Sequence, residues 1–328
     1  MKVSIIIPCY NLGQYLEQAI KSLMNQTFTD WELIVIDDGS TDEDTKNVLA
    51  NINYPKTKLI RTKNQGLPVA RNTAIREAQG EYIACLDADD QYAPTFLEKT
   101  VAVLDQDKAH RVGIVTTWIQ TYGVKEELWK TAEYDPILLA TRNVLHVASL
   151  FRRECWSKVS GYSESLKIGY QDWDFWIKIV AAGYTWECIP EPLFHYQVRE
   201  KSMVYFSNQK RPALFKSIVE NNYEFYQKNL IKIIGRFFSI AEKYEDLTHQ
   251  SLIQEDRIMK KDVFITELKA SKKILTENVR QKQKYIDDLE FSRNDFKKRI
   301  KEKDHYINEL EKVNRDLTLA QKKLVGPE

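Results

Sequence analysis

The first 120 residues alternate short apolar runs with longer segments in which apolar residues recur every three or four positions. Runs rich in Val and Ile predict strands over 3–7, 32–36, 58–61, 82–86 and 112–116. The intervening segments have a helical period and predict helices over 13–25, 42–51, 67–79 and 95–106. This alternation predicts an α/β fold with one Rossmann-like, mainly parallel sheet that carries helices on both faces.

The pattern changes after Pro212. All tryptophans lie at or before Trp186, and the only later proline is Pro327. A long, charged stretch that is almost free of Pro and Gly forms helices and little else. The sequence therefore predicts three parts: a globular domain over 1–212, a helical extension over 213–250 and a helical tail over 251–328.

The tail carries a heptad pattern from residue 258 to residue 324. With Ile258 at position a, most a positions hold Ile or Val and most d positions hold Leu. A single helix cannot bury such a stripe, and this residue choice favours a parallel coiled-coil dimer. We expect a homo-oligomer whose tail also serves as a spacer or as a docking arm for another enzyme of the same pathway.

The helical extension contains the apolar and basic segment KNLIKIIGRFF at 228–238. Two interpretations are open. The segment packs against the globular domain, or it lies on a membrane surface as a peripheral contact.

Composition excludes several classes of protein. Hydrophobic residues make up 43% of the chain, which excludes a disordered protein, and 48 Lys and Arg balance 47 Asp and Glu. No global basic field therefore draws the chain to nucleic acid. The first apolar run is too short for a signal peptide, and no stretch of about 18 apolar residues follows. Four widely spaced cysteines indicate reduced core residues, so we expect a cytoplasmic protein.

Polar residues follow each of the first four predicted strands. Since the carboxyl ends of parallel strands meet at one edge of a sheet, these residues should lie close together. They are Pro8, Tyr10 and Asn11, then Asp37 and Asp38, then Asn64 and Gly66, then Asp87, Asp89 and Asp90.

Taken one at a time, these loops also fit ordinary turn and helix-cap chemistry. Together they bring at least four carboxylates to one edge, where mutual repulsion favours a bound cation. Oxygen ligands point to Mg²⁺ or Mn²⁺, which binds few protein groups and shares its shell with substrate phosphates. No P-loop or dinucleotide fingerprint is present, so a metal ion would hold most of the diphosphate. A carboxylate at the second strand end can accept the imide N–H of a pyrimidine base.

Four segments resemble the inverting glycosyltransferase family 2, which has the A-type glycosyltransferase fold. They are SIIIPCYN, SLMNQTFTDWELIVIDDGSTD, NQGLPVARNTAIREAQGEYIACLDADD and GYQDWDFWIKIVAAGY, and the resemblance covers roughly residues 1–205. It implies metal-dependent transfer of a sugar from a nucleoside-diphosphate donor, UDP- or dTDP-linked. The acceptor would be a hydroxyl of a growing or lipid-linked glycan in bacterial surface-polysaccharide assembly.

The same resemblance assigns residues to the donor site. The nucleoside pocket would be lined by Pro8, Tyr10, Asn11 and Asp38, with Asn64, Gly66 and Arg71 supporting the donor. Asp87 and Asp89 would form the DxD motif, with Asp89 as the direct metal ligand and Asp87 nearer the ribose or donor sugar. Asp90 is expected to cap the helix that follows Pro94.

Asp172 matches the family's catalytic base, which takes a proton from the acceptor hydroxyl. Gln171 departs from the glutamate usual in the family at that position. The competing interpretation is that Asp172 caps a helix over 173–182.

Further downstream, Arg199 stands where many relatives have a metal-binding histidine, and with Ser202 it is expected to clamp the diphosphate. His195 is either a core residue or a further metal ligand. The acceptor pocket is expected within residues 118–170, where Trp118, Trp129, His146 and Trp156 could stack on sugar rings.

Two other classes of function are compatible with parts of the sequence. A catalytically silent scaffold would recruit partners through the coiled coil, but it would not need Asp87, Asp89 and Asp172. A nucleotidyltransferase would need a basic cradle for a triphosphate, and the first eighteen residues contain no Lys or Arg after Lys2.

Overall fold

The computed structural model describes residues 1–199 and 203–255, together with scattered residues between 273 and 314. The chain divides into two compact units, Met1–Lys243 and Tyr244–Glu328. In the second unit, described residues of the predicted seam such as Ile286, Ile300 and Ile307 are helical and about half exposed. Most of the predicted coiled coil over 258–324 lies outside the described residues, so the dimer stays a prediction.

The described residues of the first unit form a sheet with the strand order β3-β2-β1-β4-β8-β6-β9-β5, with β7 paired to β6. The first four strands along this order are parallel neighbours. The strands are β1 Val3–Cys9, β2 Trp31–Asp37, β3 Thr57–Arg61, β4 Tyr82–Cys85, β5 Gln91–Tyr92, β6 Val112–Gly123, β7 Leu128–Trp129, β8 Leu150–Arg152 and β9 Thr185–Val198.

The prediction of a mainly parallel sheet is wrong for the second half, because the sheet is mixed. β8 inserts between β4 and β6 and is antiparallel to both. β5 is antiparallel to β9, while β9 runs parallel to β6. β5 and β8 contain two and three residues, too few to show a period-two pattern.

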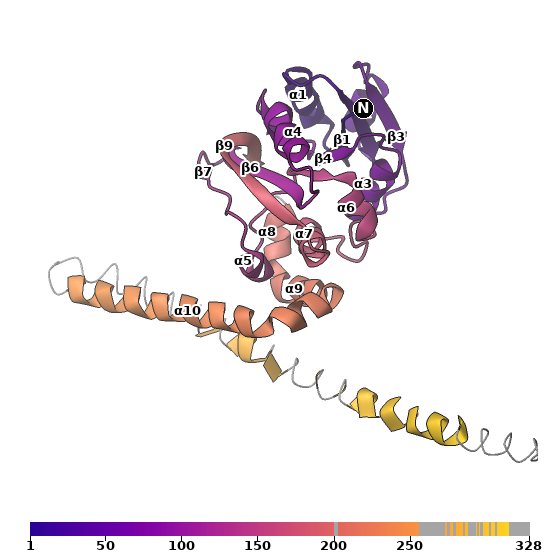
Figure 1. Ribbon diagram of the computed structural model, residues 1–328. Helices are drawn as coiled ribbons and strands as arrows, with labels where there is room; N and C mark the ends of the chain where they lie inside the picture. Colours follow the sequence, from indigo (N-terminus) through magenta and orange to yellow (C-terminus); the bar gives the residue numbers. More distant parts are fainter. Residues whose placement is uncertain are drawn as a thin grey trace, which may run out of the picture. The chain divides into compact units, whose positions relative to one another are not determined.

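Helices cover both faces of the sheet, as predicted (Figure 1). Side chains alternate along β1, so Ile5 and Ile7 join one hydrophobic cluster and Ile6 joins the other. Helices α1 and α4 cover the first face, and α3, α6 and α7 cover the second. The helices are α1 Gly13–Met24, α2 Glu43–Ala50, α3 Leu67–Arg76, α4 Phe96–Gln106, α5 Pro136–Thr141, α6 Arg153–Lys158, α7 Gln171–Ala181, α8 Met203–Gln209, α9 Arg211–Asn221 and α10 Tyr223–Glu255.

The helical extension packs on the second face. Leu214 and Ile218 of α9 and Tyr226 and Ile233 of α10 belong to the same hydrophobic cluster as the core of α7. The Tyr226 hydroxyl also donates to the backbone oxygen of Ala140 at the end of α5, at 2.9 Å. One side of α10 therefore packs against the globular domain, which confirms the first of the two interpretations of residues 228–238.

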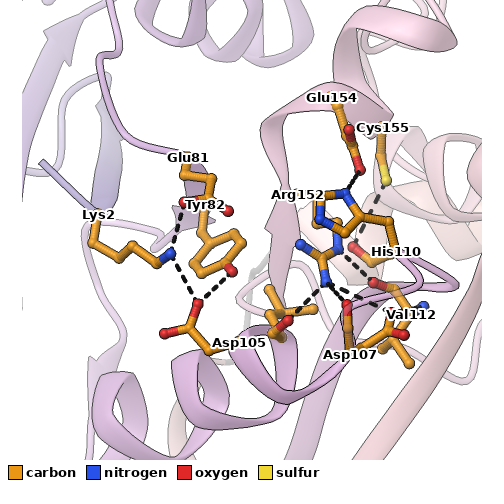
Figure 2. Close-up of polar contacts among 12 residues, drawn as sticks. Lys2, Glu81, Tyr82, Asp105, Asp107, His110, Val112, Arg152, Glu154 and Cys155 are labelled. Carbon is orange, nitrogen blue, oxygen red and sulfur yellow. Dashed lines mark hydrogen bonds and ion pairs between the residues drawn. The ribbon is translucent and has the colours of Figure 1, made fainter.

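A buried arginine joins three segments at the edge of the sheet where β1 and β4 begin (Figure 2). Arg152 is 2% exposed, and its Nε donates to the backbone oxygen of Val112 at 2.9 Å. Its Nη2 donates to the backbone oxygens of Leu104 and Asp107, at 2.7 and 3.1 Å. Leu104 lies in the last turn of α4, where carbonyl groups lack helical partners, so Arg152 completes the end of that helix.

We expect Arg152→Ala to destabilise the first unit by about 3 kcal/mol, because two buried carbonyl groups and one part-buried carbonyl group lose their donor and a cavity remains. Thermal unfolding should show a decrease in melting temperature of roughly 6 to 12 °C. Arg111→Ala is the matched control, since Arg111 is exposed nearby. A decrease no larger than that of the control would contradict the assigned role of Arg152.

Candidate active site

The loops after β1 and β2 are joined by the side chain of Asn11. Asn11 has a positive φ of 53°. Its Nδ2 donates to Thr41 Oγ1 at 3.0 Å, and its Oδ1 accepts from the backbone N–H of Thr41 at 2.8 Å. Asn11 therefore shapes the predicted nucleoside pocket. Two other residues from this part of the chain were assigned to this pocket. Pro8 is buried within β1, and Tyr10, just after the strand, is 43% exposed.

Asp38 orders the loop that follows β3. Its Oδ1 accepts the backbone N–H of Gln65 at 3.0 Å, and its Oδ2 accepts that of Gly66 at 2.9 Å. Gly66 has a φ of +99°, which favours glycine, and it immediately precedes α3. Asn64 is exposed in the same loop. Both oxygens of Asp38 thus hold backbone groups, and its contact with a base stays a prediction.

Arg71 lies beneath the first carboxylate of the acidic loop after β4. It is 1% exposed, and its Nη2 donates to Asp87 Oδ1 at 2.5 Å. Burial alone would lower the pKa of Arg71, but the charges of Asp87 and Asp172 help to raise it, so the guanidinium stays charged. Among the described residues, its Nε and Nη1 are buried without a hydrogen-bond partner. Arg71 therefore pairs with the predicted DxD motif, and the charge of the predicted base also helps to raise its pKa.

The second carboxylate, Asp89, forms an ion pair with Arg199 just after β9. Arg199 Nη2 lies 2.5 Å from Asp89 Oδ2, and the guanidinium lies 5.2 Å from the ring centre of Tyr15. Burial and then the charge of Asp87 raise the pKa of Asp89, while Arg199 opposes this shift. The predicted phosphate clamp is thus next to the predicted metal ligand. Ser202 lies outside the described residues.

The expectation that Asp90 caps the following helix is wrong. Asp90 is 1% exposed, and its Oδ1 accepts the backbone N–H of Gln197 in β9 at 2.9 Å. Helix α4 is preceded by Thr95 and has no side-chain cap. Asp90 instead fixes the acidic loop to the end of β9, close in sequence to Arg199. Burial, followed by the charges of Asp89 and Asp87, raises the pKa of Asp90 well above its usual value.

The acidic loop fits a hard divalent cation that the donor also helps to bind. Among the described residues, no three Asp, Glu, His or Cys side chains are grouped closely enough to form a metal site by themselves. Mg²⁺ commonly uses one or two carboxylates together with substrate phosphates, which Asp87 and Asp89 could provide. His195 lies within β9, paired with Gln91 of β5, and burial lowers its pKa. A metal role for His195 stays a prediction.

Asp172 lies in the first turn of α7. Its Oδ2 accepts the Nδ2–H of Asn143 at 2.8 Å, and the side chain is half-buried. Burial raises the pKa of Asp172, against the effects of Arg71 and Asn143. The helix is preceded by Tyr170, which has a φ of 62° and makes no side-chain cap. Asp172 is therefore not the cap of this helix, and a half-buried carboxylate with a raised pKa suits a general base.

Two of the four aromatic residues expected to bind the acceptor belong to the scaffold. Trp156 donates its Nε1–H to Asn72 Oδ1 at 3.0 Å. His146 stacks on Phe194 with ring centres 4.6 Å apart, and burial lowers its pKa to about 3. Trp118 is half-buried, and Trp129 is 41% exposed.

Asn143 could not be recognised from the sequence, because a single polar residue far along the chain from its carboxylate partner has no local pattern. Asp174 was also missed, although it stands only two residues from Asp172 in the QDWD segment. It is fully buried, and it binds groups from other elements.

Comparisons with known proteins agree with this architecture. Residues 4–160 match the family profile described as Glycosyl transferase family 2. The chain is 33% identical over 187 residues to chondroitin synthase of Escherichia coli, which covers 55% of this chain but only 27% of that protein. It is 31% identical over 208 residues to the putative glycosyltransferase EpsE of Bacillus subtilis, which covers 61% of this chain and 74% of that protein.

A solved structure shows the same fold at lower identity. The crystal structure of S. aureus TarS 1-349 in complex with UDP-GlcNAc is similar, with a TM-score of 0.59 and 21% identity, over 73% of each chain.

Proposed function

The chain belongs to glycosyl transferase family 2, and we propose that it transfers a sugar from a nucleoside-diphosphate donor to an acceptor hydroxyl. The observation that supports the proposal is the buried Arg71, which donates to Asp87 and whose pKa is raised by the charges of both Asp87 and Asp172. In the proposal, Asp87 contacts the donor and Asp172, whose pKa is raised by burial, is the base. The UDP-GlcNAc in the TarS complex supports a uridine donor, with a dTDP-sugar as the alternative.

In the proposed reaction, the acceptor oxygen forms a bond to the anomeric carbon as the bond from that carbon to the diphosphate breaks. Asp172 takes the proton of the acceptor hydroxyl, and Asn143 holds the carboxylate in place. A Mg²⁺ or Mn²⁺ ion bound at Asp89 would neutralise charge on the departing diphosphate. Displacement from the face opposite the leaving group inverts the anomeric centre. The proposed acceptor is a growing glycan or a lipid-linked glycan of a bacterial surface polysaccharide.

In this proposal Arg199 is the residue that binds the diphosphate, and its ion pair with Asp89 keeps it beside the predicted metal ligand. Asp89 is the carboxylate that would hold the metal ion. With that ion and the donor bound, Arg199 would instead pair with the diphosphate, which accepts the same charge-assisted hydrogen bonds. Its neighbour Gln197 stays anchored through Asp90, so only the end of the segment has to move.

The test is hydrolysis of a panel of UDP-, dTDP- and GDP-sugars with Mn²⁺, comparing the intact chain with Asp89→Ala. We expect one donor to turn over and the substitution to lower its rate by at least about 10²-fold, because charge on the leaving group is no longer neutralised. Asp30→Ala, at an exposed position after α1, is the matched control and should retain the rate. If no donor binds or reacts, with or without glycan acceptors, a silent scaffold replaces the transferase proposal.

A further inference from the structure

Helix α10 has two apolar sides between Phe225 and Ala241, and the sheet domain covers only one of them. Tyr226 and Ile233 are 7% and 6% exposed against the core. Arg236 extends this packed side, with its Nη1 2.6 Å from Asp135 Oδ2. The other side carries four apolar residues that are exposed by 45% to 86%: Leu230, Ile231, Ile234 and Phe238. At about 100° per residue, these four fall within an arc of roughly 100°.

The charges of this segment are all of one sign. From Phe225 to Ala241 the sequence has no acidic residue, and Lys228 and Lys232 are exposed. The two lysines project from the side of the helix away from the exposed apolar arc, given the helical period. A helix with an apolar stripe of Leu, Ile and Phe and a basic polar face is typical of segments that lie in a membrane interface. Long lysine side chains can reach from such a helix to lipid headgroups.

We propose that the exposed arc of α10, formed by Leu230, Ile231, Ile234 and Phe238, binds the surface of an anionic lipid bilayer. The helix lies along the bilayer and keeps its opposite contacts with the domain, so both interpretations of residues 228–238 hold at once on different sides. None of the helices within the described residues is long and apolar enough to cross a membrane. The proposed contact brings the catalytic unit to the membrane surface.

Charge favours an anionic surface over a second copy of the chain. Two copies of α10 packed through their exposed arcs would leave Lys228 and Lys232 without a countercharge, because the segment has no acidic residue to pair with them. A stable dimer also buries at least roughly 1,200 Å², and four side chains form only a small part of such an area. In an anionic bilayer the lysines can pair with the lipid headgroups while the apolar arc is buried among the lipid chains.

Vesicle flotation with the full chain tests the proposal. We expect binding to vesicles of phosphatidylcholine with phosphatidylglycerol, weaker binding at high salt, and little binding to phosphatidylcholine alone. The double variant Ile231→Asp with Phe238→Asp should lower the partition coefficient by roughly tenfold or more, because two side chains lose their burial in lipid. Lys228→Glu with Lys232→Glu should lower it by a similar factor and remove most of the salt dependence.

Val124→Asp is the matched control, because Val124 is an apolar side chain that is 65% exposed on a different part of the unit. It should bind vesicles like the unmodified chain, and circular dichroism should give the same melting temperature for all variants. Equal binding to neutral vesicles, or no effect of the α10 variants, would overturn the proposal. So would a result in which the chain ignores vesicles while Ile231→Asp with Phe238→Asp turns a dimer into a monomer in sedimentation. Hydrolysis of the sugar donor is measured separately on protein without vesicles. Loss of vesicle binding with hydrolysis retained would overturn the membrane proposal alone and leave the proposed function standing.

Discussion

Replacing Asp172 by Asn should lower the rate of sugar transfer by about 10²- to 10⁴-fold, the usual contribution of a general base. The amide has nearly the same shape as the carboxylate, and it can still face the Asn143 side chain that holds Asp172. It cannot accept the proton of the acceptor hydroxyl. The loss should therefore appear in kcat, while the affinity for the donor, measured by calorimetry, changes little.

The pH dependence of kcat gives a second readout of the same residue. Burial raises the pKa of Asp172, and a base works only when it is ionised. The rate should therefore be high above the raised pKa and fall as the pH is lowered through it. Asp172→Asn should lose this acidic limb together with most of the rate.

Glu164→Gln is the control for this experiment, because Glu164 is a carboxylate whose side chain is 55% exposed and whose ion-pair partner is Arg76, at 4.0 Å. It should keep both the rate and the pH profile. An Asp172→Asn variant that retains more than about a tenth of the activity would place the base elsewhere.

Replacing Asp174 by Ala should destabilise the first unit by about 3 to 5 kcal/mol, the range expected when one partner of a buried charged network is removed. Asp174 Oδ1 accepts from the side-chain amides of Asn221 and Asn222 at 3.0 and 2.9 Å. Its Oδ2 accepts the Ser163 hydroxyl at 2.6 Å and lies 3.2 Å from Lys178 Nζ. The substitution removes the acceptor that these groups share at the junction of α9 and α10. Among the described residues, Asn222 then keeps only the backbone oxygen of Ile218, and Lys178 and Asn221 keep only the hydroxyl oxygen of Ser163.

Chemical denaturation followed by circular dichroism measures this loss as a lower midpoint. The control is Asp44→Ala in the exposed first turn of α2, which should change stability by no more than about 0.5 kcal/mol. Because Asp174 fastens α9 and α10 to α7, proteolysis of the variant should also begin near residues 210–222. Equal stability of the two variants would show that α9 and α10 are held by their apolar contacts alone.

The sequence was sufficient for the first half of the fold. β1 and β2 are continuous apolar runs that are buried on both faces, so length and composition alone indicate strands. The helices between them show the helical period, and α3 starts after a glycine with a proline in its first turn. Because these strands are parallel, their polar ends had to meet at one edge, and the structure places Asp38, Asp87 and Asp89 there.

The second half of the sheet could not be predicted from hydrophobic periodicity. β8 has three residues, too few for a recognisable pattern of apolar and polar positions. Its position between β4 and β6 is set by hydrogen bonding and packing with those two strands. The same limit applied to Asp90. A carboxylate near a helix start suggested a cap, but a backbone N–H of β9, distant in sequence, was the partner available to it.

The sequence by itself determined the strands and helices of the parallel half and the edge that carries the carboxylates. These depend on residue type and on periods of two or about four residues, which are local properties. Only the tertiary structure decided that Arg199 pairs with Asp89, that Asn143 holds Asp172 and that Asp174 fastens α9 and α10. Each of these pairs joins residues from different elements, and the partner of a buried charge is set by how those elements pack.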